Sequence, residues 1–241
     1  MKHRIYVPPL RGDSITDPAT VHRIRNVLRL KEGDCFTGFD GVMEYTLRVT
    51  EMGRDAVRVS RDGERSAAPP PVRLTIAQAL LKGRRWDIFL EKTTEIGVWR
   101  IVPLETANTV VRLRRDEVGK KLERWRGIVR GAGAQCRGGW VPEISPPVDF
   151  AAYVGAPPAE GARLILTPGA GVATLTEALG SPAPAEVTIA VGPEGDFTPE
   201  EAGAAREAGF VPVSLGGRVL RSETAAIAAA ALTLLGERPR R

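Results

Sequence analysis

The chain has 241 residues and a formal net charge of +5, and it contains only two cysteines and two histidines. Because these residues are few and widely separated, neither a disulfide framework nor a zinc site is expected. No apolar run reaches the about 18 residues of a membrane-spanning helix, and no signal-like segment opens the sequence. We therefore expect a cytoplasmic protein with neither a membrane span nor a bound metal.

The charge is unevenly distributed along the chain. Residues 82–137 hold 14 lysines and arginines against 7 acidic residues, whereas residues 138–241 hold 7 against 12. A basic middle segment suits an anionic polymer such as RNA, because neutralising phosphates releases counterions. A solvated, arginine-rich surface explains the same count, so charge alone leaves both interpretations open.

The first 68 residues carry the pattern of a small β-barrel. Residues 4–7 predict a strand, and residues 20–30 predict a short helix. The apolar positions expected on the buried face of this helix are Val21, Ile24 and either Val27 or Leu28. His22, Arg25 and Arg29 follow one another at helical spacing, so we expect them to share another face, suited to phosphates. A lone histidine on a helix is nevertheless more often structural.

A hairpin and a linker complete this part of the chain. Asp40 and Gly41 stand between two β-like runs, which is a strong hairpin signal. The alternation that follows predicts that Met43, Tyr45, Leu47 and Val49 point inward, and that Glu44, Thr46 and Arg48 point outward. Three consecutive prolines at positions 69–71 then predict a stiff, extended connection.

Beyond the linker, strand-like and helix-like segments alternate, which predicts an α/β domain with a mostly parallel sheet. Strands are expected over residues 72–80, 100–104, 164–167, 187–191 and 211–215. Helices are expected over residues 83–96, 116–136, 172–179 and 222–236, and a further helix is expected to begin at Thr198. The first of these helices should bury Trp86, Phe89, Leu90 and Thr93, and the last should bury Ile227, Ala230 or Ala231, and Leu234. The four tryptophans favour core positions over base stacking: Trp86, Trp99, Trp125 and Trp140.

Glycine turns follow two of the expected strands. Gly192-Pro193-Glu194-Gly195 comes after residues 187–191, and Leu215-Gly216-Gly217 comes after residues 211–215. Glycine at a strand end lets a ligand or another backbone come close, and ligands of open α/β sheets bind at this edge. Neither turn is a phosphate loop or a dinucleotide fingerprint. Each turn alone is an ordinary connection, but together they indicate a small-molecule site.

The same residues carry a family resemblance. Gly192 to Phe197 and Leu220 to Ala225 resemble the signature of the knotted SPOUT methyltransferases, in particular the family that methylates N3 of one uridine in 16S ribosomal RNA. Residues 22–34, 91–104 and 135–137 resemble that family as well, so the similarity extends over nearly the whole chain. Asp196 departs from the pattern, because the family usually has a glycine there.

The resemblance implies a C-terminal α/β trefoil-knot SPOUT domain over residues 72–241 and an N-terminal PUA-like RNA-binding β-barrel over residues 1–68. It also implies a homodimer, S-adenosylmethionine as cofactor, and the small ribosomal subunit as partner. The implied cofactor-binding residues are Leu166, Thr167, Gly192, Glu194, Gly195, Leu215, Gly216, Leu220, Glu223, Thr224 and Ala225. The implied catalytic residues are Arg221 and Gln135, and the implied RNA-binding residues are Arg4, His22, Arg25, Arg29, Lys92 and Arg137.

Several alternatives stay open at this point. Glu223 is equally suited to the first turn of a helix, where an acid offsets the helix dipole. No histidine lies in the C-terminal domain, so the base that removes the uridine N3 proton is not identified. Two other functions fit the same features: a SPOUT enzyme acting on another RNA such as transfer RNA, and a non-catalytic RNA-binding protein on the same fold.

Overall fold

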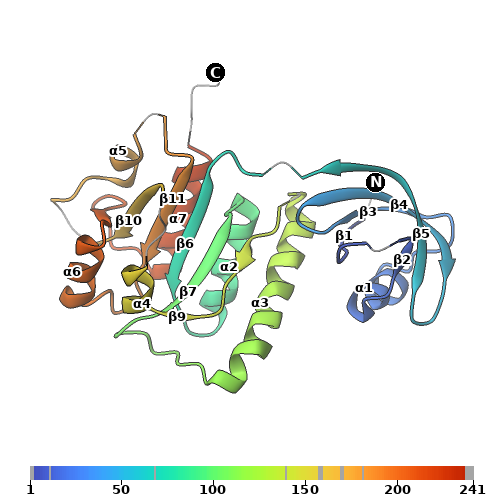
Figure 1. The fold of residues 1–241 in the computed structure, drawn as a ribbon, viewed down its shortest axis with the longest axis horizontal. Helices are drawn as coiled ribbons and strands as arrows, with labels where there is room; N and C mark the ends of the chain where they lie inside the picture. Colours follow the sequence, from blue (N-terminus) through green and yellow to red (C-terminus); the bar gives the residue numbers. More distant parts are fainter. Residues whose placement is uncertain are drawn as a thin grey trace. The chain divides into compact units, whose positions relative to one another are not determined.

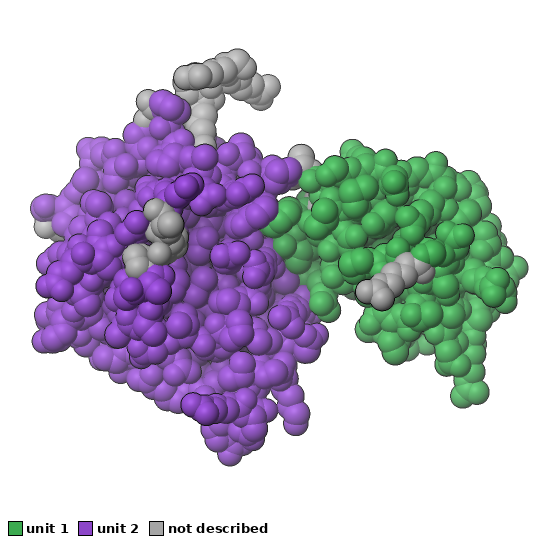
Figure 2. All heavy atoms as spheres, viewed as in Figure 1, with its two compact units in different colours: residues 1–68, 130–141 green, residues 69–129, 142–241 purple. Residues whose placement is uncertain are grey.

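The computed structural model describes residues 3–10, 12–67, 69–138, 140–156, 160–168, 171–180 and 182–236. The chain forms two compact units, coloured separately in Figure 2. The first unit contains residues 1–68 and 130–141, and the second contains residues 69–129 and 142–241. A segment far along the sequence therefore packs with the N-terminal residues.

The first unit is built on a curled sheet of five strands in the order β1-β3-β4-β5-β2 (Figure 1). The strands are β1 (Arg4–Tyr6), β2 (Ser14–Ile15), β3 (Cys35–Phe39), β4 (Met43–Met52) and β5 (Val57–Ser66). All neighbours are antiparallel except β1 and β3, which are parallel. The hairpin predicted at Asp40 and Gly41 is confirmed, since the Asp40 N–H donates to the Met43 carbonyl at 3.1 Å.

The alternation predicted for β4 is wrong at Glu44. The apolar positions that follow are buried as predicted: Tyr45, Leu47 and Val49. Glu44, however, is only 6% exposed. Its carboxylate accepts hydrogen bonds from Arg4 Nη2 at 2.6 Å and from Arg65 Nη2 at 2.6 Å and Nε at 2.8 Å. Burial alone would raise the pKa of Glu44, but the bonds from Arg4 and Arg65 outweigh burial and lower the pKa below its usual value.

The predicted N-terminal helix is shorter than expected and changes its winding. An α-helix, α1 (Pro18–His22), begins where the Asp17 carboxylate accepts from the Thr20 N–H at 2.8 Å. A π-helical turn, η1 (Arg23–Val27), continues it. Val21 and Ile24 are buried as predicted.

Arg29 lies beyond this helix, with a φ of 53°. The prediction that His22, Arg25 and Arg29 share one helix face is therefore wrong for Arg29, because a π turn and a left-handed residue break the 3.6-residue period. All three side chains are exposed.

The second unit contains a parallel sheet, and the predicted α/β architecture is confirmed. Its order is β12-β10-β11-β6-β7-β8, with β9 also paired to β7. The strands are β6 (Arg73–Ala79), β7 (Arg100–Glu105), β8 (Glu143–Ile144), β9 (Val148–Asp149), β10 (Ala162–Leu166), β11 (Glu186–Val191) and β12 (Val211–Val213). The helices are α2 (Arg84–Ile96), α4 (Phe150–Gly155), α5 (Leu175–Leu179), α6 (Pro199–Glu207) and α7 (Ser222–Leu234). Helix α3 (Arg115–Cys136) begins in the second unit, and its residues from 130 onward belong to the first.

Most helix boundaries follow local signals. At the start of α6, Thr198 and Glu201 form the capping box that the sequence predicts. Helix α5 begins later than expected because Thr174 and Glu177 form a second capping box there. Trp86 and Trp125 are buried against each other, with ring centroids 5.1 Å apart. Trp99 and Trp140 are half-buried, so the core prediction is confirmed for the first pair only.

The buried stripe predicted for the last helix is confirmed at Ala230 but wrong at Ile227 and Leu234. Helix α7 buries Ala226, Ala229, Ala230 and Thr233, whereas Ile227 and Leu234 are only half-buried. Helix α7 packs against α2 and β6, and small side chains on its inner face allow this close approach. No helix in the described part of the chain is long and apolar enough to cross a membrane.

Candidate active site

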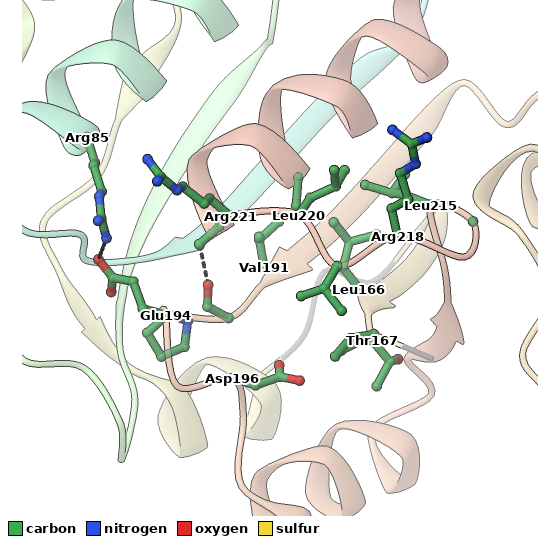
Figure 3. A pocket seen from close by; sticks show the side chains of 17 residues that line it. Arg85, Leu166, Thr167, Val191, Glu194, Asp196, Leu215, Arg218, Leu220 and Arg221 are labelled. Atoms are coloured by element: carbon green, nitrogen blue, oxygen red, sulfur yellow. Dashed lines mark hydrogen bonds and ion pairs between the residues drawn. The ribbon is translucent and has the colours of Figure 1, made fainter. Parts of the chain in front are cut away.

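A cavity of about 420 Å³ opens at the carboxyl ends of three neighbouring strands (Figure 3). Leu166 and Thr167 lie at the end of β10, Val191 and Gly192 at the end of β11, and Leu215 just after β12. Parallel strands bring their carboxyl ends to one edge, where ligands of α/β proteins bind. The volume lies within the range of about 300–1,000 Å³ that is usual for small-molecule sites.

Most of the predicted cofactor residues line this cavity. Those on its wall are Leu166, Thr167, Gly192, Glu194, Leu215, Gly216, Leu220 and Ala225, together with Arg221. Those that do not line it are Gly195, Glu223 and Thr224. In Figure 3, the apolar side chains of Leu166, Val191 and Leu220 face one another across the cavity.

A buried hydrogen-bond network joins the two signature segments. Gln78, at the end of β6, is fully buried, and its Nε2 donates to Ser222 Oγ at 2.8 Å and to the Gly192 carbonyl at 3.4 Å. Ser222 Oγ donates to the same Gly192 carbonyl. The first residue of α7 is thereby fixed to the turn after β11, which holds the two walls of the cavity together.

The two glycines of the first turn serve the packing of the turn itself. A Cβ on Gly192 would lie 2.9 Å from Asp196 Oδ1, and a Cβ on Gly195 would lie 3.2 Å from Asn108 Cβ. Asn108 also donates from Nδ2 to the carbonyls of Gly195 at 2.9 Å and Asp196 at 3.0 Å. Gly195 therefore makes room for Asn108.

Asp196 follows this turn with a φ of 60°, a conformation that favours glycine and that aspartate tolerates better than most side chains. Its Oδ1 accepts the Phe197 N–H at 2.8 Å, and its half-buried carboxylate lines the cavity beside Thr167 (Figure 3). Burial raises the pKa of Asp196, although the hydrogen bond from Phe197 opposes the rise. The cavity wall therefore carries a carboxylate with one oxygen committed to the turn.

Sequence reasoning missed Arg85 and Arg218, which also line the cavity. Arg85 Nη1 lies 2.7 Å from Glu194 Oε1, and Arg85 Nε lies 3.9 Å from Glu223 Oε1. The other oxygen of Glu223, Oε2, is buried without a hydrogen-bond partner among the described residues. Arg85 comes shortly after β6, which lies next to β11 in the sheet, and this strand order brings it close to the cavity. No motif around Arg85 in the sequence indicates that position.

The remaining predicted residues lie elsewhere. Gln135, Arg4 and Arg137 belong to the first unit and line a second cavity there, whereas Arg221 lines the cavity of the second unit. Lys92, on α2, binds Glu91 Oε1 and Glu95 Oε1 at 2.9 Å each, and these hydrogen bonds raise its pKa. The described residues contain no group of three or more potential metal ligands.

Comparisons with known proteins agree on one family. Residues 68–234 match the family model of the RNA methyltransferase domain. The chain is 34% identical to ribosomal RNA small subunit methyltransferase E of Synechocystis sp., over 93% of this chain and 75% of the relative. It is also 34% identical to the Mycobacterium tuberculosis protein of the same name, over 90% of this chain and 82% of the relative.

Solved structures resemble the chain over almost its full length. A putative methyltransferase from Legionella pneumophila, in complex with S-adenosylmethionine, superposes with a TM-score of 0.88 at 32% identity, covering 97% of both chains. Ribosomal RNA small subunit methyltransferase E from Neisseria gonorrhoeae, bound to S-adenosylmethionine, gives a TM-score of 0.85 at 30% identity and covers 98% of both chains.

Proposed function

Since the chain belongs to the RNA methyltransferase family that includes the ribosomal RNA small subunit methyltransferase E proteins, we propose that it methylates N3 of a uridine in 16S ribosomal RNA with S-adenosylmethionine as donor. The observation that carries the proposal is the cavity at the ends of β10, β11 and β12, because residues of both signature segments line it. We place the activity in the cytoplasm, on the small ribosomal subunit.

The residues of the cavity fit such a cofactor. Apolar side chains at Leu166, Val191 and Leu220 suit an adenine ring, and the backbone near Gly192 and Leu215 supplies polar groups for its edge. The guanidinium groups of Arg85 and Arg218 suit the carboxylate of an amino-acid tail, and the Asp196 carboxylate suits the positively charged sulfur. When bound, S-adenosylmethionine supplies a methyl group activated by a positively charged sulfur.

Arg221 is the residue of this chain that we assign to catalysis. It is exposed, lies at the N-terminus of α7 and lines the cavity. Loss of the N3 proton leaves negative charge on the uracil ring, and a fixed guanidinium stabilises such charge. The chain's further contribution is positioning, because methyl transfer needs the acceptor nitrogen in line with the methyl carbon.

We further propose a trefoil knot in the SPOUT domain, a PUA-like character for the N-terminal barrel, and a homodimer. The knot is supported by the family to which the chain belongs, through the resemblance of its two signature segments to the knotted methyltransferases. The dimer is supported by apolar side chains that α7 and its end leave exposed, Leu232 and Leu235.

RNA contact by His22, Arg25, Arg29 and Lys92 is also part of the proposal. All three of the first residues are exposed, which leaves their side chains accessible to RNA. Arg25 donates a long hydrogen bond, of 3.5 Å, to the Arg54 carbonyl. Lys92 has the weakest support, since two glutamates already neutralise its charge.

Transfer of labelled methyl groups tests the proposal. Small ribosomal subunits and bulk transfer RNA are each incubated with the protein and labelled S-adenosylmethionine, and label should enter only the ribosomal RNA. Arg221→Ala should bind cofactor normally but transfer about 10²–10³ times more slowly, as when a preorganised charge stabiliser is lost. Label in transfer RNA would favour a different substrate. RNA binding without any calorimetric signal for the cofactor would favour a non-catalytic RNA-binding protein.

A further inference from the structure

A loop from another part of the second unit holds the turn that carries Asp196. The loop, residues 106–114, connects β7 to α3, whereas the turn, Gly192 to Asp196, follows β11. Asn108, on the loop, donates from Nδ2 to the carbonyls of Gly195 at 2.9 Å and Asp196 at 3.0 Å. One side-chain amide therefore connects two segments that are 87 residues apart in the sequence.

The two carbonyls that accept these bonds lie on either side of the rotatable backbone bonds of Asp196. The Gly195 carbonyl precedes the φ of Asp196, and the Asp196 carbonyl follows its ψ. Because both oxygens are bound to one amide, both dihedral angles are restrained, and with them the direction in which the side chain leaves the backbone. The restrained conformation is an uncommon one, since the φ of Asp196 is 60°. Such conformations persist where the surrounding structure holds them.

The loop that presents Asn108 is itself held on both sides of that residue. Thr106 and Thr109 are buried, and their hydroxyl groups are hydrogen-bonded to each other at 2.8 Å. The Ala107 N–H donates to Oε1 of Glu201, the glutamate of the α6 capping box, at 2.7 Å. The Asn108 amide therefore projects from a fixed backbone and can serve as a fixed point for the turn.

The restraint reaches the cofactor cavity through Asp196, because Asp196 lines the cavity wall and Asn108 does not. Oδ1 of Asp196 accepts the Phe197 N–H at 2.8 Å, so the direction of the carboxylate follows the backbone of the turn. Asn108 itself is exposed, and truncating it takes no side chain out of the core. The attraction between two charges depends on the distance between them, so a carboxylate held in place attracts a cationic ligand more strongly than one that moves.

We propose that Asn108 is a positioning residue of the cofactor site, which fixes the Asp196 carboxylate where it favours the cationic S-adenosylmethionine over the reaction product S-adenosylhomocysteine, which has no net charge. Asn108 acts only through the turn that it holds. Selectivity for the charged donor limits inhibition by the product, since both compounds compete for one cavity. The inference rests on the proposed function in taking S-adenosylmethionine as the cofactor.

Titration calorimetry of the full-length protein with both compounds tests the inference. Asn108→Ala should bind S-adenosylmethionine about two to ten times more weakly, as expected for one net hydrogen bond, because ordering the carboxylate then draws on the binding energy. The affinity for S-adenosylhomocysteine should change much less, since it depends little on the charge of Asp196. Val110→Ala is the matched control, because Val110 lies on the same loop and is 73% exposed, and it should bind both compounds like the wild type.

Two further measurements show whether Asn108 acts through Asp196. In a double-variant cycle, Asp196→Asn removes the charge, so adding Asn108→Ala should cause no further loss of affinity for S-adenosylmethionine. Hydrogen exchange followed by mass spectrometry reports on the turn directly. Asn108→Ala should exchange faster over residues 193–198, and α7 should exchange as it does in the wild type.

Equal losses of affinity for the two compounds in Asn108→Ala would overturn the inference, because they would indicate general damage to the cavity. Unchanged affinities, unchanged exchange over residues 193–198, or a loss that simply multiplies with that of Asp196→Asn would overturn it as well. A wild-type protein that binds neither compound would contradict the proposed function instead. In that case the exchange measurement, which contains no cofactor, would still decide whether Asn108 holds the turn.

Discussion

Replacing Asp196 should weaken binding of the cationic cofactor without disturbing the fold. Asp196→Asn retains an oxygen for the Phe197 N–H and tolerates the φ of 60°, but it removes the charge from the cavity wall. Asp196→Gly removes the charge and the hydrogen bond, but it relieves the backbone. The first variant therefore isolates the effect of charge.

The cavity sets the magnitude of this effect. A sphere of 420 Å³ has a radius of about 5 Å, which approximates the distance from the wall to a ligand charge. At an effective dielectric constant of about 40, between the values for a protein surface and for water, one charge pair at about 5 Å contributes about 1.7 kcal/mol. That energy corresponds to a loss of roughly tenfold to twentyfold in affinity.

Titration calorimetry with two ligands measures the effect. S-adenosylmethionine carries a net positive charge and should bind Asp196→Asn more weakly by this factor, whereas S-adenosylhomocysteine has no net charge and should lose much less. Burial raises the pKa of Asp196, so wild-type affinity should fall as the pH drops through that raised pKa and the carboxylate becomes neutral. The Asn variant should not show this fall. Equal losses for both ligands, or none, would refute the reasoning.

Three other changes test the structure. Arg85→Ala removes the ion-pair partner of Glu223. Because the arginine is partly exposed, the free energy of unfolding should fall by only about 1 kcal/mol in a thermal melt. Glu44→Gln should cost about 2–3 kcal/mol in urea unfolding at pH 7, below the value for a fully buried pair because Arg65 is 76% exposed. Folding lowers the pKa of Glu44, so the stability that its carboxylate contributes is present above the unfolded-state pKa of about 4.3. This stability is lost as the pH falls through the folded-state pKa, where the unfolding free energies of variant and wild type should converge. Ala229→Leu should overpack the contact of α7 with α2 and β6 and cost about 1–3 kcal/mol, and unchanged stability would contradict this close packing.

The features that could be predicted from the sequence are those with local signals. The capping box at Thr198 and Glu201, the hairpin at Asp40 and the glycine turns around Gly192 and Gly216 each depend on residues that are close in sequence. Alternation of strand and helix patterns then predicted the parallel sheet, and the sheet brings the turns to one edge.

The features that could not be predicted depend on partners distant in sequence. Glu44 is buried only because Arg4 and Arg65 reach it, from 40 and 21 residues away. Arg85 meets Glu194 across 109 residues, and Asn108 reaches Gly195 across 87.

Helix α7 illustrates a different difficulty. Its alanines make the helix itself easy to predict, but so many small residues leave several faces almost equally apolar. The larger residues, such as Ile227 and Leu234, indicated the wrong face, because the face of α7 that is buried carries alanines and Thr233 instead.

The most direct test of the account is nucleoside analysis of 16S ribosomal RNA after reaction with labelled S-adenosylmethionine. Small subunits that lack the modification are incubated with the wild-type protein or with Arg221→Ala, and the RNA is digested and separated by liquid chromatography with mass detection. The account predicts that the label appears in 3-methyluridine with the wild-type protein and is strongly reduced with the variant. Label in any other nucleoside, or none despite bound cofactor, would contradict it.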